Sequence, residues 1–294
     1  MGDLVHVVLP CLVVGGLLGW RWPSRLGWLA PVLIHWGVPL SLAGLLLRAS
    51  PSATLLKVGI LAGLVPLLCL GLFLGCSPLR HRLGHRVMIL GAAVGNTGYW
   101  GVPVALALLP PESLPTAVMY DVAGTLVTWS VGPLLLLGVQ ASVQKQMSAF
   151  LSSPALKGCA LWLLIGQSPW KHAFAAVLWW PARAVFAMAL VLLGMRLGET
   201  IRGATFTLSP GLCWAVGWKL LGVPAVVWLL AHGLALPDLD RQALVLQGAA
   251  PTALSVLLIA EAEPHAGAMA SSLVLTSTLL AIVTVPFWWG VMLR

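Results

Sequence analysis

Long apolar runs separated by short polar stretches are the feature that most limits how this chain can fold. Most runs approach the ~20 residues that a helix needs to cross the hydrocarbon layer of a membrane. They lack the polar residue at every second position that is typical of a membrane barrel, so they predict helices. We expect ten membrane-spanning segments, at Asp3–Trp20, Ala30–Leu47, Ala53–Gly75, Val87–Leu109, Pro115–Val139, Met147–Gly166, His172–Leu197, Leu208–Leu236, Asp240–Ala260 and Pro264–Met292.

The composition favours the same class of protein. Only 8% of the 294 residues are charged, whereas soluble domains contain about 25%. No polar stretch is long enough for a soluble domain, so residues 1–294 are expected to form a single membrane domain in the lipid bilayer. The net charge of +8 fits basic loops and requires no nucleic-acid partner. The five cysteines have no CxxC or histidine-spaced pattern, so neither a disulfide framework nor a metal site is expected.

The fourth segment is interrupted by the sequence Gly95-Asn96-Thr97-Gly98-Tyr99-Trp100-Gly101-Val102-Pro103. Glycine and proline weaken or break a helix, because glycine costs backbone entropy and proline lacks an N–H. Lipid offers no water to the freed backbone groups, so a broken helix at membrane depth is tolerated only against protein or beside a wet cavity. The interruption is therefore either a local kink or part of a binding site.

A second interruption occurs five segments later, at the corresponding place. The ninth segment carries Gln247-Gly248-Ala249-Ala250-Pro251-Thr252-Ala253-Leu254-Ser255. Transporters are often built from two inverted repeats, with broken helices at corresponding positions and the substrate between them. The pattern predicts one inverted repeat of about residues 1–146 and a second of about residues 147–294.

These motifs resemble those of the auxin efflux carrier family, which includes plant carriers and bacterial permeases. The first interruption is similar to the family's pattern of Asn, Thr-Gly, an aromatic residue, Gly and Pro. Ala250–Ala253, followed by the acidic Glu261, is similar to the second-half pattern. Further matches are Lys219–Pro224, Thr278–Pro286 and Ser153–Ala155, where Ser replaces the family's Asn. The resemblance extends over nearly the whole chain.

The resemblance implies the all-α fold of the bile acid/sodium symporters, in which two inverted five-helix repeats contribute broken, crossing fourth and ninth helices. It implies a scaffold of helices 1, 2, 6 and 7 and a transport domain of helices 3–5 and 8–10. The implied function is secondary active transport of small organic anions by an elevator-type alternating-access mechanism. The long hydrophilic loop of many plant carriers is missing between the fifth and sixth segments, which points to the short bacterial type.

The first interruption supplies most of the candidate substrate-binding residues. Tips of broken helices present N–H groups and partial positive charge, to which a carboxylate can bind. Asn96 is the leading candidate for direct contact; the alternative is an amide that only caps freed backbone groups. Gly98 and Gly101 allow the backbone to approach a ligand closely, and Trp100 is a candidate for stacking on it.

The second interruption supplies two more candidates. Gln247 and Thr252 are equally compatible with ligand contact and with hydrogen bonds between helices. Pro103 and Pro251, one in each interruption, are expected to break their helices rather than to contact a ligand.

Two ionisable residues within apolar segments are functional candidates, because charge inside a membrane is costly. Asp121 is a candidate proton or cation site, since burial favours the neutral form of a carboxyl; the alternative is an interfacial carboxylate paired with a base. Lys219 either neutralises an anion, pairs with Asp121, or extends its long stem to an interface.

Basic residues in the loops predict the orientation. With the N-terminus outside, nine basic residues are cytoplasmic and five are external, with Arg183 unassigned. The loop with Arg80, Arg82 and Arg86 is then inside, as is Arg196. Both termini are expected outside the plasma membrane, or inner membrane of a bacterium.

Two function classes fit these features: a secondary transporter of small carboxylates and a non-transporting receptor or sensor of the same fold. An enzyme is not expected, because no paired-Asp, HExxH or GxSxG motif lies in the spans. No GxxxxGK[ST] motif is present, so no cofactor is expected and H+ or Na+ is the candidate coupling ion. Auxin-like indoles, malate and malonate all remain candidate substrates, and a homodimer is one candidate assembly.

Overall fold

The computed structural model describes residues 4–22, 29–138, 144, 147–148, 151–203, 208–261 and 266–293. No strand occurs among these residues, and their one isolated β-bridge joins Gly95 to Thr252. The prediction of an all-helical protein is thus confirmed for this part of the chain. The helices are η1 (Leu4–Val8), α1 (Leu9–Arg21), α2 (Leu29–Val32), η2 (Leu33–Gly37), α3 (Val38–Leu46), α4 (Ala53–Gly75), α5 (Ser77–Leu83), α6 (Arg86–Ala93), η3 (Thr97–Gly101), α7 (Val102–Leu108), η4 (Pro111–Ser113), α8 (Leu114–Leu137), α10 (Pro154–Ile165), α11 (Lys171–Val177), α12 (Trp179–Gly203), α13 (Pro210–Gly217), η6 (Trp218–Gly222), α14 (Val223–Gly233), α15 (Asp238–Gly248), α16 (Leu254–Ala260) and α17 (Ala266–Met292).

Among the described residues, five helical stretches are long and apolar enough to cross a membrane: α4, η4–α8, α12, α13–α14 and α17. The apolar helices over residues 6–21, 30–46 and 154–165 are shorter. The predicted fourth and ninth segments each consist of two helices joined by a non-helical link, with α6 and η3–α7 in one and α15 and α16 in the other. Arg25, Lys145 and Arg294, which contribute to the charge bias, lie outside the described residues.

Serine residues fix the start of three helices. The hydroxyl oxygens of Ser52, Ser153 and Ser209 accept hydrogen bonds from the backbone N–H three residues later, at 3.2, 3.3 and 3.1 Å. Such N-caps satisfy one of the N–H groups that a helix leaves without a partner in its first turn. A proline follows Ser153 and Ser209 at the first helical position, where it loses no hydrogen bond.

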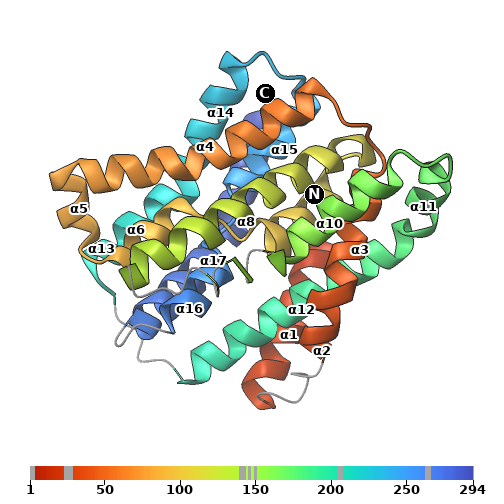
Figure 1. The fold of residues 1–294 in the computed structure, drawn as a ribbon. Helices are drawn as coiled ribbons and strands as arrows, with labels where there is room; N and C mark the ends of the chain where they lie inside the picture. Colours follow the sequence, from red (N-terminus) through yellow and green to blue (C-terminus); the bar gives the residue numbers. More distant parts are fainter. Residues whose placement is uncertain are drawn as a thin grey trace.

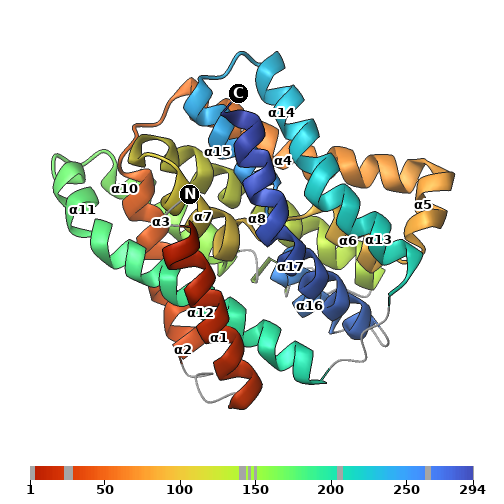
Figure 2. The ribbon, with the colours of Figure 1, turned by 180° about the vertical axis from the view of Figure 1, so that it is seen from behind.

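The helices fall into two groups that are visible from both sides of the molecule in Figures 1 and 2. We call residues 4–22, 29–51 and 151–203, which include α1, α3, α10 and α12, the α12 group. We call residues 52–138, 208–261 and 266–293, which include α4–α8 and α13–α17, the α8 group. The α12 group contains the predicted scaffold helices and the α8 group the predicted transport helices.

A seam of glycines joins α1 to α12 within the α12 group. A Cβ atom added to Gly15 or Gly19 would overlap the backbone of Val191 or Met195, and one added to Gly198 would overlap the backbone of Gly16. Glycines four residues apart on both helices thus let the two backbones approach closely, as in membrane helix pairs of the small-xxx-small type. This contact gives the α12 group a tightly packed core.

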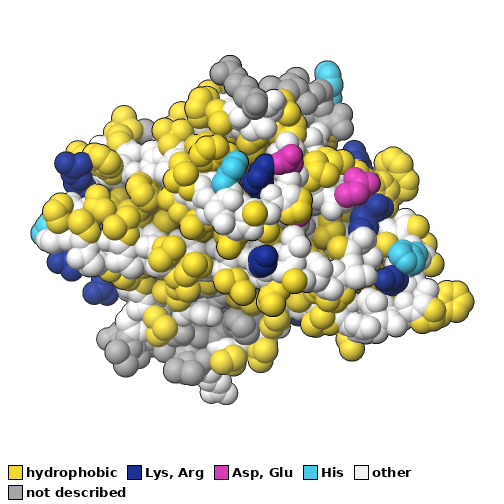
Figure 3. Space-filling view, turned by 90° about the horizontal axis from the view of Figure 1, so that it is seen from above, with side chains coloured by type: hydrophobic (Ala, Val, Ile, Leu, Met, Phe, Trp, Pro, Cys, Tyr) yellow, Lys and Arg dark blue, Asp and Glu magenta, His cyan; other side chains and the backbone are white. Residues whose placement is uncertain are grey.

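The surface of the molecule is largely apolar. The exposed large side chains include Leu56, Ile60, Leu164, Val177 and Val283, each of which is at least 60% exposed. Figure 3 shows apolar side chains spread over one whole face, with only scattered basic and acidic side chains among them. Exposed apolar area on this scale is typical of a surface that faces lipid rather than water.

Candidate functional site

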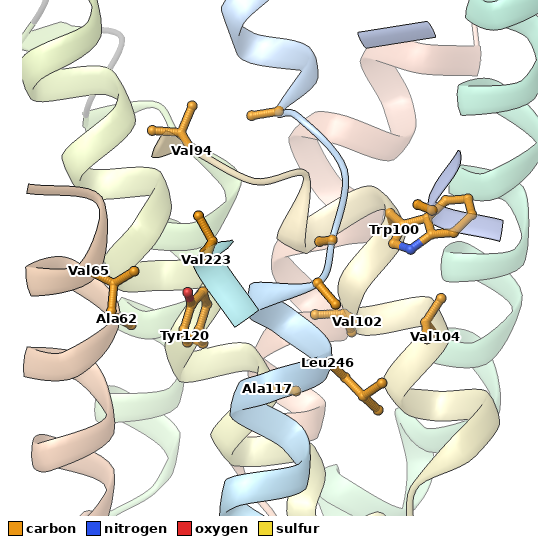
Figure 4. Packing of buried hydrophobic residues seen from close by; sticks show 14 of the residues in the cluster. Ala62, Val65, Val94, Trp100, Val102, Val104, Ala117, Tyr120, Val223 and Leu246 are labelled. Atoms are coloured by element: carbon orange, nitrogen blue, oxygen red, sulfur yellow. The ribbon is translucent and has the colours of Figure 1, made fainter. Parts of the chain in front are cut away.

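The two interrupted segments lie side by side and complete each other's backbone hydrogen bonds. The N–H of Asn96 donates to the carbonyl of Pro251 at 2.7 Å, and the N–H of Ala253 donates to the carbonyl of Val94 at 3.2 Å. Figure 4 shows the link that follows Val94 running beside the link between α15 and α16. Each interruption therefore satisfies backbone groups that the other leaves free, which is what buried irregular backbone requires.

Thr252 holds this junction together from the second interruption. Its hydroxyl donates to the carbonyl of Gly91 at 2.9 Å, and its backbone N–H donates to the hydroxyl of Ser277 at 3.1 Å. The side chain is completely buried and does not line the cavity described next. Of the two roles that the sequence left open for Thr252, the structure displays the hydrogen bonds between helices.

A cavity of about 630 Å³ lies between the two helix groups, within the range of small-molecule sites. The α8 group contributes the first interruption, part of α8 and the start of α16. The α12 group contributes a wall that is apolar except for Arg196 and Glu199. The lining residues of the α8 group are Gly95, Asn96, Thr97, Gly98, Tyr99, Asp121, Thr125, Thr128, Trp129, Ala253, Leu254, Ser255 and Leu258.

Asn96 is the buried polar residue of this cavity that lacks a partner for its side-chain donor. It is 4% exposed, and its Nδ2 has no hydrogen-bond partner among the described residues. Its backbone is fully engaged, because its carbonyl accepts from the N–H groups of Trp100 and Gly101 at 3.2 and 3.1 Å. A buried amide donor without a partner costs free energy, so a ligand oxygen at this position would remove that cost.

Asp121 lies in the same wall as Asn96 and is also 4% exposed. Its carboxylate accepts a hydrogen bond from the hydroxyl of Thr97 at 2.6 Å. The absence of a side chain at Gly98 makes this possible, because a Cβ there would lie 3.1 and 3.3 Å from the two carboxylate oxygens. The structure thus brings Asn96, Gly98 and Asp121 together.

Lys219 lies behind the interruption rather than in the cavity. It is 1% exposed, and its Nζ donates to the carbonyl of Gly248 at 2.7 Å. That carbonyl belongs to the last turn of α15, where backbone acceptors lack helical partners and a positive charge is favourable. The stem of Lys219 also approaches Gly95, where a Cβ would lie 3.2 Å from Nζ. In this structure Lys219 therefore neither pairs with Asp121 nor extends to a membrane interface.

Five other candidates lie outside the cavity lining, namely Gly101, Gln247, Trp100, Pro103 and Pro251. Gln247 is completely buried against Gly101, and neither its Nε2 nor its Oε1 has a hydrogen-bond partner among the described residues. Trp100 of η3 is 1% exposed and does not line the cavity, and Figure 4 shows it among the buried hydrophobic residues. Pro103 and Pro251 occupy the start of α7 and the second link, where each removes a backbone donor.

Two comparisons with known proteins bear on this arrangement. A family described as membrane transport protein matches residues 160–289. A protein of Methanocaldococcus jannaschii called an uncharacterized transporter is 22% identical over 99% of both chains. Another uncharacterized transporter, from Methanothermobacter thermautotrophicus, is 27% identical over 68% of this chain and 66% of its own. These matches support the predicted resemblance to the auxin efflux carrier family.

The family match and the transporter-named relatives support a membrane transport protein and are consistent with a non-enzyme. The described residues contain no group of three or more His, Cys, Asp or Glu side chains that could hold a metal ion. Within the same residues the five cysteines are free thiols. The polar groups that line the cavity include amide, hydroxyl, carboxylate and guanidinium groups.

Sequence reasoning missed several residues that line the cavity of this chain. Arg196 and Glu199 contact each other at 3.3 Å on α12, and the sequence assigned Arg196 only to a loop. Thr97, Tyr99 and Thr125 are ordinary residues of helical segments until the tertiary structure turns them toward the cavity. One signal was present for Thr97 and Tyr99, since both stand inside the first interruption.

Proposed function

We propose that this chain is a secondary active transporter that moves small organic anions by an elevator-type mechanism, with the α8 group sliding against the α12 group. The substrate carboxylate binds beside Asn96, at the junction of the two interruptions. The other candidate, a receptor of the same fold that binds a carboxylate without moving it, is distinguished by the flux assay below.

The observation that carries this proposal is the division of polar contacts between the two groups. Apart from those of His85, Ser152 and Glu199, the hydrogen bonds, ion pairs and ring contacts among the described residues lie within one group or the other. Within the α8 group, for example, Thr116 donates to Asp240 and the indole of Trp288 donates to the carbonyl of Leu220. Within the α12 group, Trp162 donates to Ala49 and Arg202 to Trp20.

An interface whose described contacts are mostly apolar favours sliding, because apolar contacts have no fixed direction and can be exchanged for others. The distribution of polar side chains between the two walls of the cavity also favours sliding. The buried polar side chains of the lining, Asn96, Thr97, Asp121 and Thr128, all belong to the α8 group. A substrate bound to these groups would move with them past a mostly apolar surface.

The proposed architecture is a single membrane domain of ten spans in two inverted repeats, about residues 1–146 and 147–294. Its support is the position of the interruptions, each in the fourth span of its repeat, and their contact through Asn96 and Pro251. The fourth and ninth spans would cross at this contact, as they do in transporters with inverted repeats.

The proposed orientation makes this an inward-facing state. With both termini outside the plasma membrane, Arg196 and Glu199 on α12 and Pro154 at the start of α10 lie near the cytoplasm, and all three line the cavity. Arg196 is well placed there to attract an anion, because its side chain is 60% exposed. H+ or Na+ is the proposed coupling ion.

The test is a flux assay on the purified full chain in proteoliposomes. A thermal-shift screen of malate, malonate, indole acetate and related carboxylates selects the ligands. Preloaded vesicles then exchange the unlabelled ligand for its labelled form if the chain is a transporter. Binding without any exchange would identify a receptor instead, and neither binding nor exchange would contradict the whole proposal.

A further inference from the structure

A buried carboxylate without a basic partner lines a cavity that we propose to hold an anion. Asp121 is 4% exposed and bonds only to hydroxyl groups in the described part of the chain, with Thr97 at 2.6 Å. The ion pairs among the described residues lie elsewhere, between Arg196 and Glu199 and between Arg241 and Asp238. In a medium of low dielectric constant, an unpaired charge of this kind carries a large free-energy cost.

The charged and titratable groups around Asp121 do not remove this cost. Tyr99 of η3 faces the same cavity. Arg196 and Glu199 line it from α12 and bond to each other. Lys219 of η6 lies behind Gly95 with its Nζ on the carbonyl of Gly248. The parts of α2, α3, α10 and α16 that line the cavity contribute no charged side chain.

A substrate carboxylate beside Asn96 would place a second negative charge in the same buried wall. A second negative charge in the same buried wall disfavours the charged form of Asp121, and a bound proton removes this repulsion. We propose that Asp121 is the proton-carrying group of this transporter, binding one proton when the substrate anion binds beside Asn96. The inference rests on the proposed transport function and adds the identity and the site of the coupling ion.

The packing of Asp121 favours a proton over a metal ion. Both carboxylate oxygens lie 3.1 and 3.3 Å from where a Cβ of Gly98 would stand, and Oδ1 also accepts from Thr97. A bound metal ion needs several converging oxygen ligands, whereas a proton needs one free lone pair.

The step balances simply. The carboxylate of Asp121 gains a proton from one side of the membrane, becomes a neutral carboxylic acid during translocation, and returns the proton on the other side. No bond of the substrate is made or broken. A monoanion therefore crosses with no net charge, and a dianion such as malate crosses with one negative charge.

The experiment measures uptake of labelled malate into proteoliposomes under an inward proton gradient, and malate exchange without a gradient. The Asp121→Asn variant carries a permanently neutral side chain, so it should retain exchange and lose gradient-driven accumulation by roughly tenfold or more. Glu112→Gln is the matched control, because Glu112 is an exposed acid outside the cavity lining. The control should accumulate malate as the unchanged chain does.

A second measurement does not depend on the variant folding. A pH dye inside vesicles of the unchanged chain counts protons that enter with malate, and one proton per malate supports the proposal. No proton entry, accumulation driven only by Na+, or full gradient-driven accumulation by Asp121→Asn would overturn it.

Malate and aspartate are a matched pair of probes that tests whether Asp121 binds a proton or a positively charged group of the substrate. Aspartate differs from malate by an ammonium group in place of the hydroxyl. If aspartate exchanges and malate does not, Asp121 binds the substrate's own positive charge and the proton proposal is wrong. If neither malate, malonate, indole acetate nor aspartate exchanges with the unchanged chain, the proposed transport function itself fails.

Discussion

At the scale of single residues, the unpaired amide of Asn96 is the group whose loss should affect ligand binding most directly. Asn96→Ala removes a donor to a charged ligand, and such a hydrogen bond contributes about 1.5–3 kcal/mol. We expect carboxylate affinity to fall roughly ten- to hundredfold, measured by thermal shift and by exchange kinetics.

The control for this prediction is Gln242→Ala, an amide on α15 outside the cavity lining. It should leave affinity unchanged. Equal affinity of Asn96→Ala and the unchanged chain would remove Asn96 from the binding site.

Lys219 stabilises the fold by donating a hydrogen bond to the buried carbonyl of Gly248. Lys219→Met keeps the length of the stem but leaves the buried carbonyl of Gly248 without its donor, which should cost about 1–3 kcal/mol of unfolding free energy. Thermal unfolding in detergent measures this loss. Lys57→Met, at an exposed position of α4, should melt with the unchanged chain; if both variants melt alike, the bond to Gly248 contributes nothing.

Some residues of the site belong to a local sequence motif, whereas others come together only in the tertiary structure. Asn96 and Gly98 stand in an interruption whose local chemistry is visible in the sequence. The pairing of Asp121 with Thr97 spans 24 positions and depends on how α8 packs against η3, so no local pattern encodes it. Trp100 is a candidate for stacking on a substrate by its place in the interruption, and in the structure its side chain lies in the protein core.

At the scale of elements, the close contact of α1 with α12 depends on its glycines, because a glycine has no Cβ atom to hold the two helices apart. Gly15→Ala adds a Cβ that overlaps the carbonyl of Val191, and overpacking of this kind costs about 1–3 kcal/mol. We expect a lower melting temperature.

The neighbouring Gly16 supplies a matched control on the same helix. A Cβ there would lie 3.8 Å from the Gly194 carbonyl, an ordinary contact distance. Gly16→Ala should be neutral or slightly stabilising, because alanine has the higher helix propensity. Similar melting temperatures for the two variants would show that the seam tolerates wider spacing.

The helices could be predicted from the sequence, but the contact between the two interruptions could not. Hydropathy located the long helices and the two interrupted ones, because apolar length and the positions of glycine and proline are local properties. The link between the interruptions is different: the bond from Asn96 to Pro251 connects parts of the chain that only the tertiary structure brings together. The glycine spacing on α1 and α12 was readable in principle as a small-xxx-small pattern.

At the scale of the whole molecule, sliding of one group against the other predicts that a covalent tie between them stops transport. Leu106 of α7 and Phe186 of α12 line a common cavity of only about 40 Å³ between the groups. A Leu106→Cys and Phe186→Cys pair, in a background without the native cysteines, should form a disulfide that abolishes exchange while carboxylate binding persists.

Each single-cysteine variant should transport, and reduction should restore transport by the pair. Undiminished exchange by the oxidised pair would contradict a displacement of the two groups. Loss of binding together with exchange would mean that the tie distorts the site.

The mutual bonding of the two interruptions also sets an order of events during synthesis. The segment around Asn96 emerges from the ribosome more than 150 residues before its partner around Pro251 and Thr252. At ribosomal rates the first interruption waits roughly ten to thirty seconds for that partner. During this interval its open backbone groups need the insertion machinery or water, so the first half of the chain completes its fold only when the second half arrives.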